Sequence, residues 1–234
     1  MSQIFLPNPV NNKRLEVRLD RTYDIIYYGR NNVYPQEQEQ LRLISPLIKS
    51  STALLEDFIN GSGWEFNSDV VLNSLGQTAR DLLNLVAMDY AKYNGFALWT
   101  GNNPLGEVTE VKHIPFEYNR LGLPNEKGQV DFIAVSNNWE QDPYKLPQGG
   151  HLEPEYYPVF DPRTASQGVL EGSANGQVLY FSGLEQGQYP LSTFDVINQT
   201  AESDDAIQVY ERHHIKRGFH GQTIFRYPGK LETD

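Results

Sequence analysis

The strongest constraint on the fold is a series of turn and helix-start residues in the first quarter of the chain. A glycine and two asparagines within 29–32 predict a turn, and Tyr34-Pro35 predicts an extended entry into a short polar helix over 37–44. Ser45 then has the right chemistry for an N-cap, with Pro46 at the first helical position, where its missing amide costs nothing. The segment therefore predicts a turn followed by two consecutive helices.

The second of these helices carries an apolar stripe. Its apolar residues recur at spacings of three and four, so they share one face of the helix, and Gly61 and Gly63 end it. Such a face is expected to be buried against the rest of the protein. The stripe consists of Leu47, Ile48, Ser51, Leu54, Leu55, Phe58 and Ile59.

The middle of the chain changes from helix to strands. A long helix is expected over 72–92, and strands are expected after it. The region 140–174 is rich in Pro, Gly, Gln and acidic residues, which is typical of a long surface excursion. The fold class is therefore α+β, with helices packed on a mixed or mainly antiparallel sheet. The expected strands lie over 94–99, 108–115, 130–136 and 177–182.

A long polar helix is expected over 193–217. Ser192 is its expected cap, Asp195 lies in the first turn, where the helix dipole favours an acid, and Lys216 lies in the last turn. The few apolar residues of this helix would support it poorly within one chain. Packing against neighbouring copies would support it better, and a strand over 222–227 is expected to follow it.

This order of elements resembles the N-terminal wing and stem portion of bacteriophage portal proteins, especially those of phages and prophages of Bacteroidetes-like hosts. The family has a similar small-polar-aromatic-Pro element, then a Ser-Pro helix and a Gly-x-Gly turn. The segment Tyr90–Ala97 is similar to the helix-to-strand junction of the portal wing, and Tyr189-Pro190 before a long helix is similar to the start of the stem. The family has a Tyr-Pro-x-Pro turn before this helix and an Asn-Gly-Phe-like turn after it. This sequence differs from each pattern in a single residue, within Leu191-Ser192 and within Arg217-Gly218-Phe219.

The resemblance implies a wing-like α+β domain over 1–187 and a stem-like helix with a terminal strand over 188–234, in a protein that continues with further helices. It also implies a ring, usually of twelve copies, at one vertex of the virion capsid, assembled in the cytoplasm of the bacterial host. The implied partners are other copies of the chain, the terminase large subunit, capsid proteins, neck or adaptor proteins, and double-stranded DNA that passes through without sequence-specific binding.

The candidate residues for the ring interface or the channel lie on the helix that is expected to face neighbouring copies. They are all charged, and they are Asp204, Asp205, Glu211, Arg212, Lys216 and Arg217.

The net charge of −11 and the pI near 4.9 argue against a nucleic-acid-binding surface, which needs Lys and Arg to displace phosphate counterions. An acidic channel that repels phosphates fits this charge, and so does a charge that only keeps the protein soluble. No apolar run approaches the roughly 18 residues of a membrane span, and the first residues do not resemble a signal peptide. The absence of cysteine excludes disulfides and thiolate metal ligands.

No pattern in the sequence indicates catalysis, a cofactor or a metal. His213 and His214 are adjacent, so on a helix they point about a hundred degrees apart and cannot grip one ion together. Acidic pairs such as Glu107 with Glu110 are expected to be solvated surface groups, and no phosphate-binding glycine-rich loop is present. The chain is therefore not expected to be an enzyme.

A carbohydrate-binding or carbohydrate-active domain is the alternative. Trp64, Trp99, Trp139 and fourteen tyrosines could offer ring faces to sugars from the strand-rich middle of the chain. Aromatic residues also favour strands for packing reasons alone. A sugar-binding domain would not need a long polar helix near residue 217, and that helix separates the two hypotheses.

Overall fold

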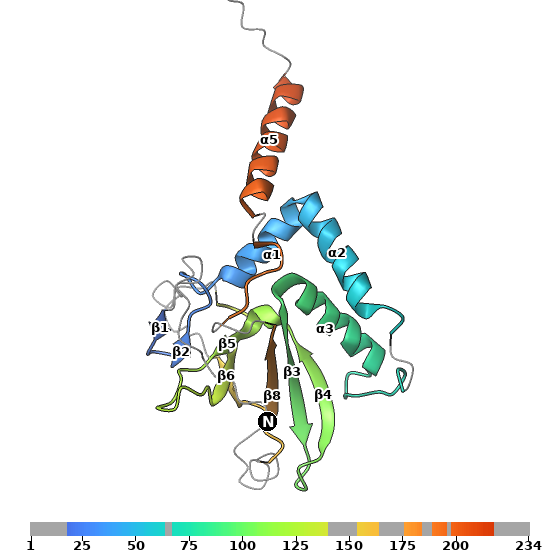
Figure 1. The fold of residues 1–234 in the computed structure, drawn as a ribbon, viewed down its shortest axis with the longest axis vertical. Coiled ribbons are helices and arrows are strands. Elements are labelled where there is room, and N and C mark those ends of the chain that lie inside the picture. The colour runs from blue at the N-terminus through green and yellow to red at the C-terminus, as the bar shows by residue number, and fades with distance from the viewer. Residues whose placement is uncertain are drawn as a thin grey trace, which may run out of the picture.

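The computed structural model describes residues 18–63, 67–139, 154–163, 176–183, 189–195 and 198–217. These residues form an α+β fold in which helices cover three small antiparallel sheets, which confirms the predicted fold class. Figure 1 shows the sheets and helices α1 to α3 as one body, from which helix α5 projects at one end. The predicted strand over 222–227 lies outside the described residues.

Helices α1 (Tyr34–Ile44) and α2 (Pro46–Asn60) meet at Ser45, as predicted. The Ser45 hydroxyl accepts a hydrogen bond from the Ile48 amide, and Pro46 occupies the first turn of α2. Helix α1 begins earlier than expected because Pro35 lies within its first turn, where a fixed φ and a missing amide are tolerated. Gly61, in a left-handed conformation with φ 51°, ends α2.

Removing the Ser45 hydroxyl is expected to cost about 1 kcal/mol of folding free energy, the usual value of an N-cap. Because Ser45 is buried, no water molecule can replace the lost acceptor at the Ile48 amide. The S45A variant is compared with S50A, whose hydroxyl is exposed inside the same helix. Urea unfolding should separate the two variants; equal midpoints would contradict the capping role of Ser45.

Helix α3 (Ala79–Tyr93) is shorter than the predicted helix over 72–92. Thr78 and Asp81 form a reciprocal capping box, which fixes the start of the helix at Ala79. The preceding residues form a turn closed by a bridge between Val71 and Thr78. The prediction was wrong over 72–78 because apolar spacing alone extended the helix past its cap.

The first three-stranded sheet has the order β4-β3-β8, and all its pairs are antiparallel. The predicted strands here are confirmed, although β3 runs three residues further than expected. Leu98 at the centre of β3 lies opposite His113 on one side and Leu179 on the other. Helix α3 packs on this sheet, and α2 packs on α3 (Figure 1). The strands are β3 (Gly95–Asn102), β4 (Val108–Ile114) and β8 (Gln177–Ser182).

A second antiparallel sheet, of order β5-β6-β7, lies beside the first one. Strand β7 corrects the expectation of a surface excursion over 140–174, since its residues pair with β6 and place Tyr157 opposite Ile133. A parallel bridge between Val159 and Val178 joins the two sheets. The elements of this side are β1 (Leu19–Asp20), β2 (Ile25–Ile26), the short helix η1 (Phe116–Tyr118), β5 (Asn119–Leu121), β6 (Phe132–Val135) and β7 (Glu155–Pro158).

Stacked aromatic rings form the centre of the core. Tyr28 stacks between Tyr34 and Tyr189, with ring centroids 5.3 and 4.1 Å apart. Phe116 stacks between Tyr93 and Tyr180 at 5.8 and 5.2 Å, and its ring meets the edge of Tyr28. The core therefore joins the N-terminal turn, helix α3, both sheets and the segment that precedes α5.

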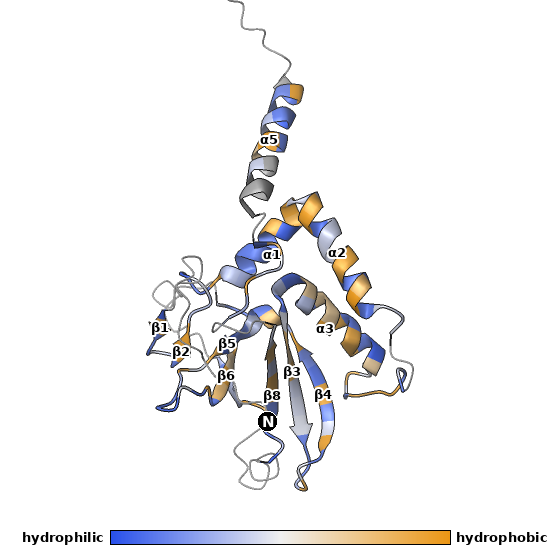
Figure 2. Cartoon of the chain, viewed as in Figure 1, coloured by the Kyte–Doolittle hydropathy of each residue, from blue (hydrophilic) through white to orange (hydrophobic). Residues whose placement is uncertain are grey.

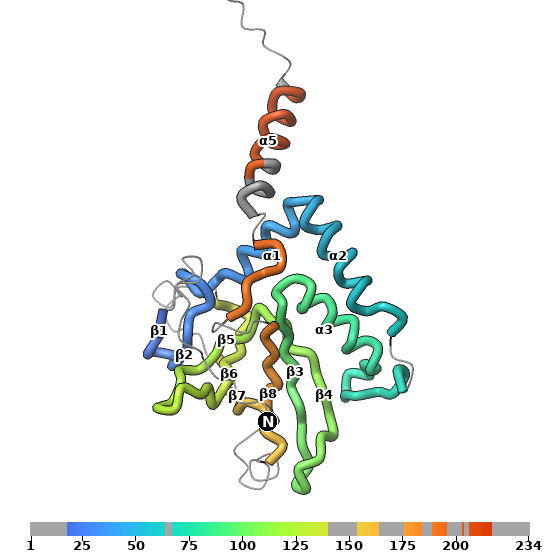
Figure 3. Tube along the Cα trace, in the orientation of Figure 1, coloured from blue at the N-terminus to red at the C-terminus, as the bar shows by residue number. Residues whose placement is uncertain are grey.

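Helix α5 (Asn198–Arg217) contacts α1 near its base and extends away from the body (Figures 1 and 3). The three residues 193–195, predicted to be helical, form a turn in which the Asp195 amide donates to the Ser192 carbonyl. Among the helices of the described ranges, none is long and apolar enough to cross a membrane.

Candidate functional site: the base of helix α5 and the outer face of helix α2

The segment 189–195, here called the anchor segment, is held in the core by tyrosine hydroxyls. The Tyr189 hydroxyl donates to the Ile26 carbonyl at 2.6 Å and accepts from the Leu121 amide at 2.7 Å. The Tyr28 hydroxyl donates to the Pro190 carbonyl at 2.5 Å. Both rings are buried, so these bonds are shielded from water. They fix the start of the anchor segment to the N-terminal hairpin.

The end of the anchor segment is fixed to helices α1 and α3. The Tyr34 hydroxyl donates to the Asp195 carboxylate and accepts from the Ser192 amide, both at 3.0 Å. The Ser192 hydroxyl donates to the Lys92 carbonyl at the end of α3 at 2.8 Å. The Ser192 hydroxyl also accepts from the Phe194 amide at 3.3 Å, as a cap would, but residues 193–195 form a turn and the described part of α5 begins at Asn198. Both Ser192 and Asp195 also bind the body. They set where the chain leaves the body toward α5.

Arg120 is a fully buried arginine beneath this region. Its Nε and Nη2 atoms donate to the side-chain and main-chain oxygens of Asn32 at 2.5 and 2.6 Å. Its Nη1 atom donates to the carbonyls of Glu117 and Asn119, both at 2.8 Å. No carboxylate forms an ion pair with it among the described residues. Hydrogen bonds to carbonyl oxygens therefore offset most of the free-energy cost of burying this charge.

Aromatic faces complete the environment of Arg120. Its guanidinium lies 5.6 Å from the Tyr28 ring centroid and 5.1 Å from that of Trp139. Burial lowers the pKa of Arg120 to about 10, because a charged guanidinium is costly away from water. Burial raises the pKa of Tyr28 well above its ordinary value for the same reason. The group holds together the N-terminal turn and strand β5, and sequence reasoning did not find it.

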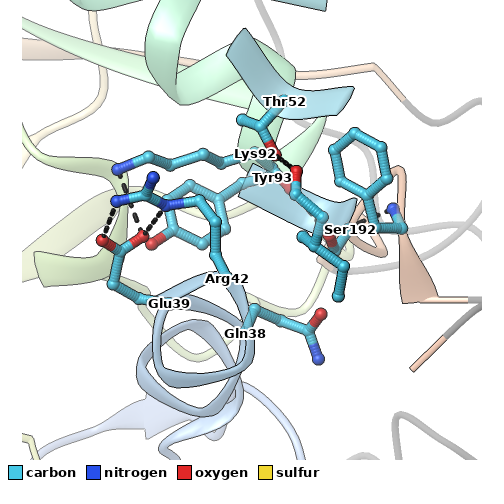
Figure 4. Close-up of a pocket in the computed structure, with 9 residues that line it drawn as sticks. Gln38, Glu39, Arg42, Thr52, Lys92, Tyr93 and Ser192 are labelled. Carbon is cyan, nitrogen blue, oxygen red and sulfur yellow. Dashed lines mark hydrogen bonds and ion pairs between the residues drawn. The ribbon is translucent and has the colours of Figure 1, made fainter. Parts of the chain in front are cut away.

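A small pocket lies between α1, α2, α3 and the anchor segment (Figure 4). Glu39 accepts from Arg42 at 2.9 and 2.5 Å and forms an ion pair with Lys92 at 3.2 Å. Burial opposes ionisation of Glu39, but hydrogen bonds and positive charge from Arg42 and Lys92 prevail and lower its pKa. The space is too small for a ligand larger than water. We interpret this pocket as a polar contact between helices α1 and α3.

The structure places the predicted interface residues on helix α5. Glu211, Arg212 and Lys216 are exposed, and the side chains of Asp204, Asp205 and Arg217 lie outside the described part of the helix. Exposed apolar residues accompany them, and Tyr210 contacts the His214 ring at 4.2 Å. The interface role of the charged residues stays a prediction. The exposed apolar side chains are Ile207, Val209, Tyr210 and Ile215.

The apolar stripe of α2 is buried only in part. Leu47, Leu54 and Phe58 are 56%, 72% and 82% exposed, whereas Ile48 and Thr52 face inward. Helix α3 covers the inner side of α2, and the large apolar side chains lie on the side away from it. Figure 2 shows this hydrophobic colouring along α2 and at its junction with α1. The helical spacing was correct, but one edge of the stripe, at Leu47, Leu54 and Phe58, is surface, whereas Ile48 on the other edge is buried.

The tryptophans give little support to a sugar site. Trp139 is 4% exposed, its indole donates to the Tyr118 carbonyl, and one face lies against Arg120. Trp99 is half-buried with Lys112 over its ring at 4.8 Å, and Trp64 lies outside the described residues. Among the residues that the structure describes, no group of three His, Asp or Glu side chains could hold a metal ion.

No protein-family model and no curated protein matches the sequence. Among solved structures, the fold is similar to that of a chain in the neck of an empty GTA (gene transfer agent) particle, computed with C6 symmetry. The TM-score is 0.54 and the sequence identity 11%, over 83% of this chain and 53% of that chain. This chain thus spans about half the length of the chain it matches, and the likeness is one of fold.

Proposed function

We propose that this protein is a ring-forming structural subunit at the head–tail junction of a phage-like particle, and that its role there is that of a portal. The fold similarity to a chain of a GTA particle neck, over 83% of the present sequence, is the observation that carries the proposal. The order of sequence elements supports it separately, because it resembles the portal wing and stem. The role is mechanical and electrostatic, without catalysis.

Helix α5 and the anchor segment suit this role. A helix that projects from a rigid body can pack beside the same helix of neighbouring copies and surround a channel (Figure 1). The exposed Ile207 and Tyr210 would supply apolar contact between copies. A net charge of −11 per chain would repel DNA phosphates and let double-stranded DNA slide without sequence-specific binding.

The partners of such a subunit follow from the proposal. Further copies would form the ring at one capsid vertex of the virion, in contact with capsid and neck or adaptor proteins. The terminase large subunit would dock there and hydrolyse ATP during packaging. Assembly would take place in the cytoplasm of the bacterial host.

The proposal is tested by absolute mass from light scattering, with electron microscopy of the same samples, over a range of protein and salt concentrations. A closed ring of six or twelve copies is the expected result. A double substitution on α5, I207D with Y210D, is expected to raise the apparent dissociation constant at least 100-fold, because it places two charges in an apolar contact.

The matched control carries T109D, an exposed position on β4, and should assemble like the unmodified protein. Discrete closed rings that persist with I207D and Y210D would exclude α5 from the interface. A protein without any ring under all conditions would overturn the proposed function.

A further inference from the structure

One side of α2 carries a row of apolar side chains that no residue of the described ranges covers. Leu47, Leu54 and Phe58 are spaced by seven and four residues, so they form one row about 16 Å long at 1.5 Å per residue. Leu43 and Ile44, at the end of α1, are also about half exposed and extend the row past Ser45. Side chains of this size leave several hundred square ångströms of hydrocarbon in water, which on a soluble protein marks an interaction surface.

The row is complementary to the same row of a second copy when the two helices run antiparallel. In an antiparallel pair of α2 helices related by a two-fold axis between Thr52 and Ala53, Leu47 lies opposite Phe58 of the other copy. Leu54 then lies opposite Ser51, so a large side chain meets a small one. No charged residue lies within the row itself. These are the properties of an isologous contact, in which the same patch serves both partners.

The charged residues nearest to the row do not oppose this pairing. Asp57, the exposed acid beside the row, would lie about 13 Å along the axis from its copy in the partner. That separation exceeds the screening length of about 8 Å at physiological salt. A standard interface buries about 800 Å² per partner, so the row would form its apolar centre and the flanking residues would form its rim.

We propose that α2 binds α2 of a second copy of this chain, antiparallel and about a two-fold axis. This contact differs from the ring contact proposed above, because it pairs identical surfaces and does not use α5. It therefore does not depend on the ring. Because each chain carries a net charge of −11, added salt should strengthen the pairing.

Cysteine crosslinking tests the register directly, since the chain contains no cysteine. A disulfide needs Cα atoms within about 7 Å. Under oxidation a mixture of L47C and F58C chains should form a mixed disulfide dimer, while each variant alone should form little. L54C lies near the axis and should crosslink alone. K49C, exposed on another side of the same helix, is the control and should stay uncrosslinked.

Solution mass provides the second measurement. F58D should raise the dissociation constant of the dimer at least 100-fold and leave the circular dichroism unchanged, because Phe58 is 82% exposed in the single chain. The α5 variant I207D with Y210D should keep the L47C–F58C crosslink, which separates this pairing from ring formation. The proposal is overturned if L47C alone crosslinks as well as the mixture, or if the mixture behaves like K49C.

Discussion

Replacing Arg120 with methionine is expected to lower the free energy of unfolding by about 3–5 kcal/mol, because several buried oxygens lose a charged donor and each unsatisfied acceptor costs roughly 1–3 kcal/mol. Methionine is apolar and two atoms shorter, so a small cavity where the guanidinium nitrogens lay adds to the loss. The loss comes from the carbonyls of Asn32, Glu117 and Asn119, to which methionine cannot donate. Of these, the Glu117 carbonyl keeps a second donor, the Gln36 side-chain amide at 3.2 Å. Urea unfolding followed by tryptophan fluorescence measures it, and Trp139 beside the guanidinium makes a local probe.

Two further variants make this test specific. R120K keeps the charge but not the planar fork of donors, so it should lie between methionine and the unmodified protein. R163M removes an exposed arginine whose partner is Asp161, and should change stability little. A methionine variant at position 120 that is as stable as R163M would contradict the role of the buried network.

The second large effect is expected in alkali, where the protein should unfold cooperatively. Burial raises the pKa of each of four core tyrosines, Tyr28, Tyr93, Tyr180 and Tyr189, above the ordinary value of 10.0. In the unfolded chain these phenols ionise near pH 10, whereas in the folded protein they stay protonated. The folded state then binds more protons, so stability falls as pH rises above 10.

The change in the free energy of unfolding per pH unit follows from the number of protons that the folded and unfolded states bind. Each buried tyrosine removes about 1.4 kcal/mol per pH unit above pH 10. Arg120 acts in the opposite direction, because its folded-state pKa of about 10 lies below its unfolded value. It therefore adds back about 1.4 kcal/mol of stability per pH unit. The net loss is about 4 kcal/mol per pH unit. Against a typical stability of about 5–15 kcal/mol, unfolding is expected between about pH 11 and 14.

Circular dichroism and tyrosinate absorbance, recorded in one titration, measure this transition. The core tyrosines should ionise together with the loss of helix signal. Y189F should reduce the slope by about 1.4 kcal/mol per pH unit, although it also loses the bonds to Ile26 and Leu121. Ionisation of all tyrosines near pH 10 with intact circular dichroism would show that the phenols are not buried.

Local signals in the sequence predicted local structure well. Ser45 with Pro46 marks the start of α2, and a run of apolar and aromatic residues marks β8 over 177–182, because these patterns act within a few residues of themselves. The stripe on α2 shows where such signals stop. A helical period identifies an apolar face, but the same period arises whether that face meets its own core or another molecule.

Arg120 and β7 were missed for a different reason. An isolated arginine in a sequence is expected to be exposed to solvent. Only the folded structure brings Asn32 and the turn before β5 into contact with Arg120. Likewise β7, four residues long, becomes a strand through its pairing with β6 and has little pattern of its own. The candidate α5 surface was predicted from its charges, whereas the anchor segment beneath it depends on contacts between distant parts of the chain.

The anchor segment also bears on when a subunit becomes competent to assemble. The hydrogen bonds that the hydroxyls of Tyr28, Tyr34 and Tyr189 donate join residues that are 162, 161 and 163 positions apart in the sequence, respectively. Contacts between such distant residues form late in folding, because the intervening loop must close first. The base of α5 is therefore set only after both ends of the body have met. A partly folded chain would lack a fixed base for α5, and in the proposed ring the fold itself would exclude such unfinished subunits.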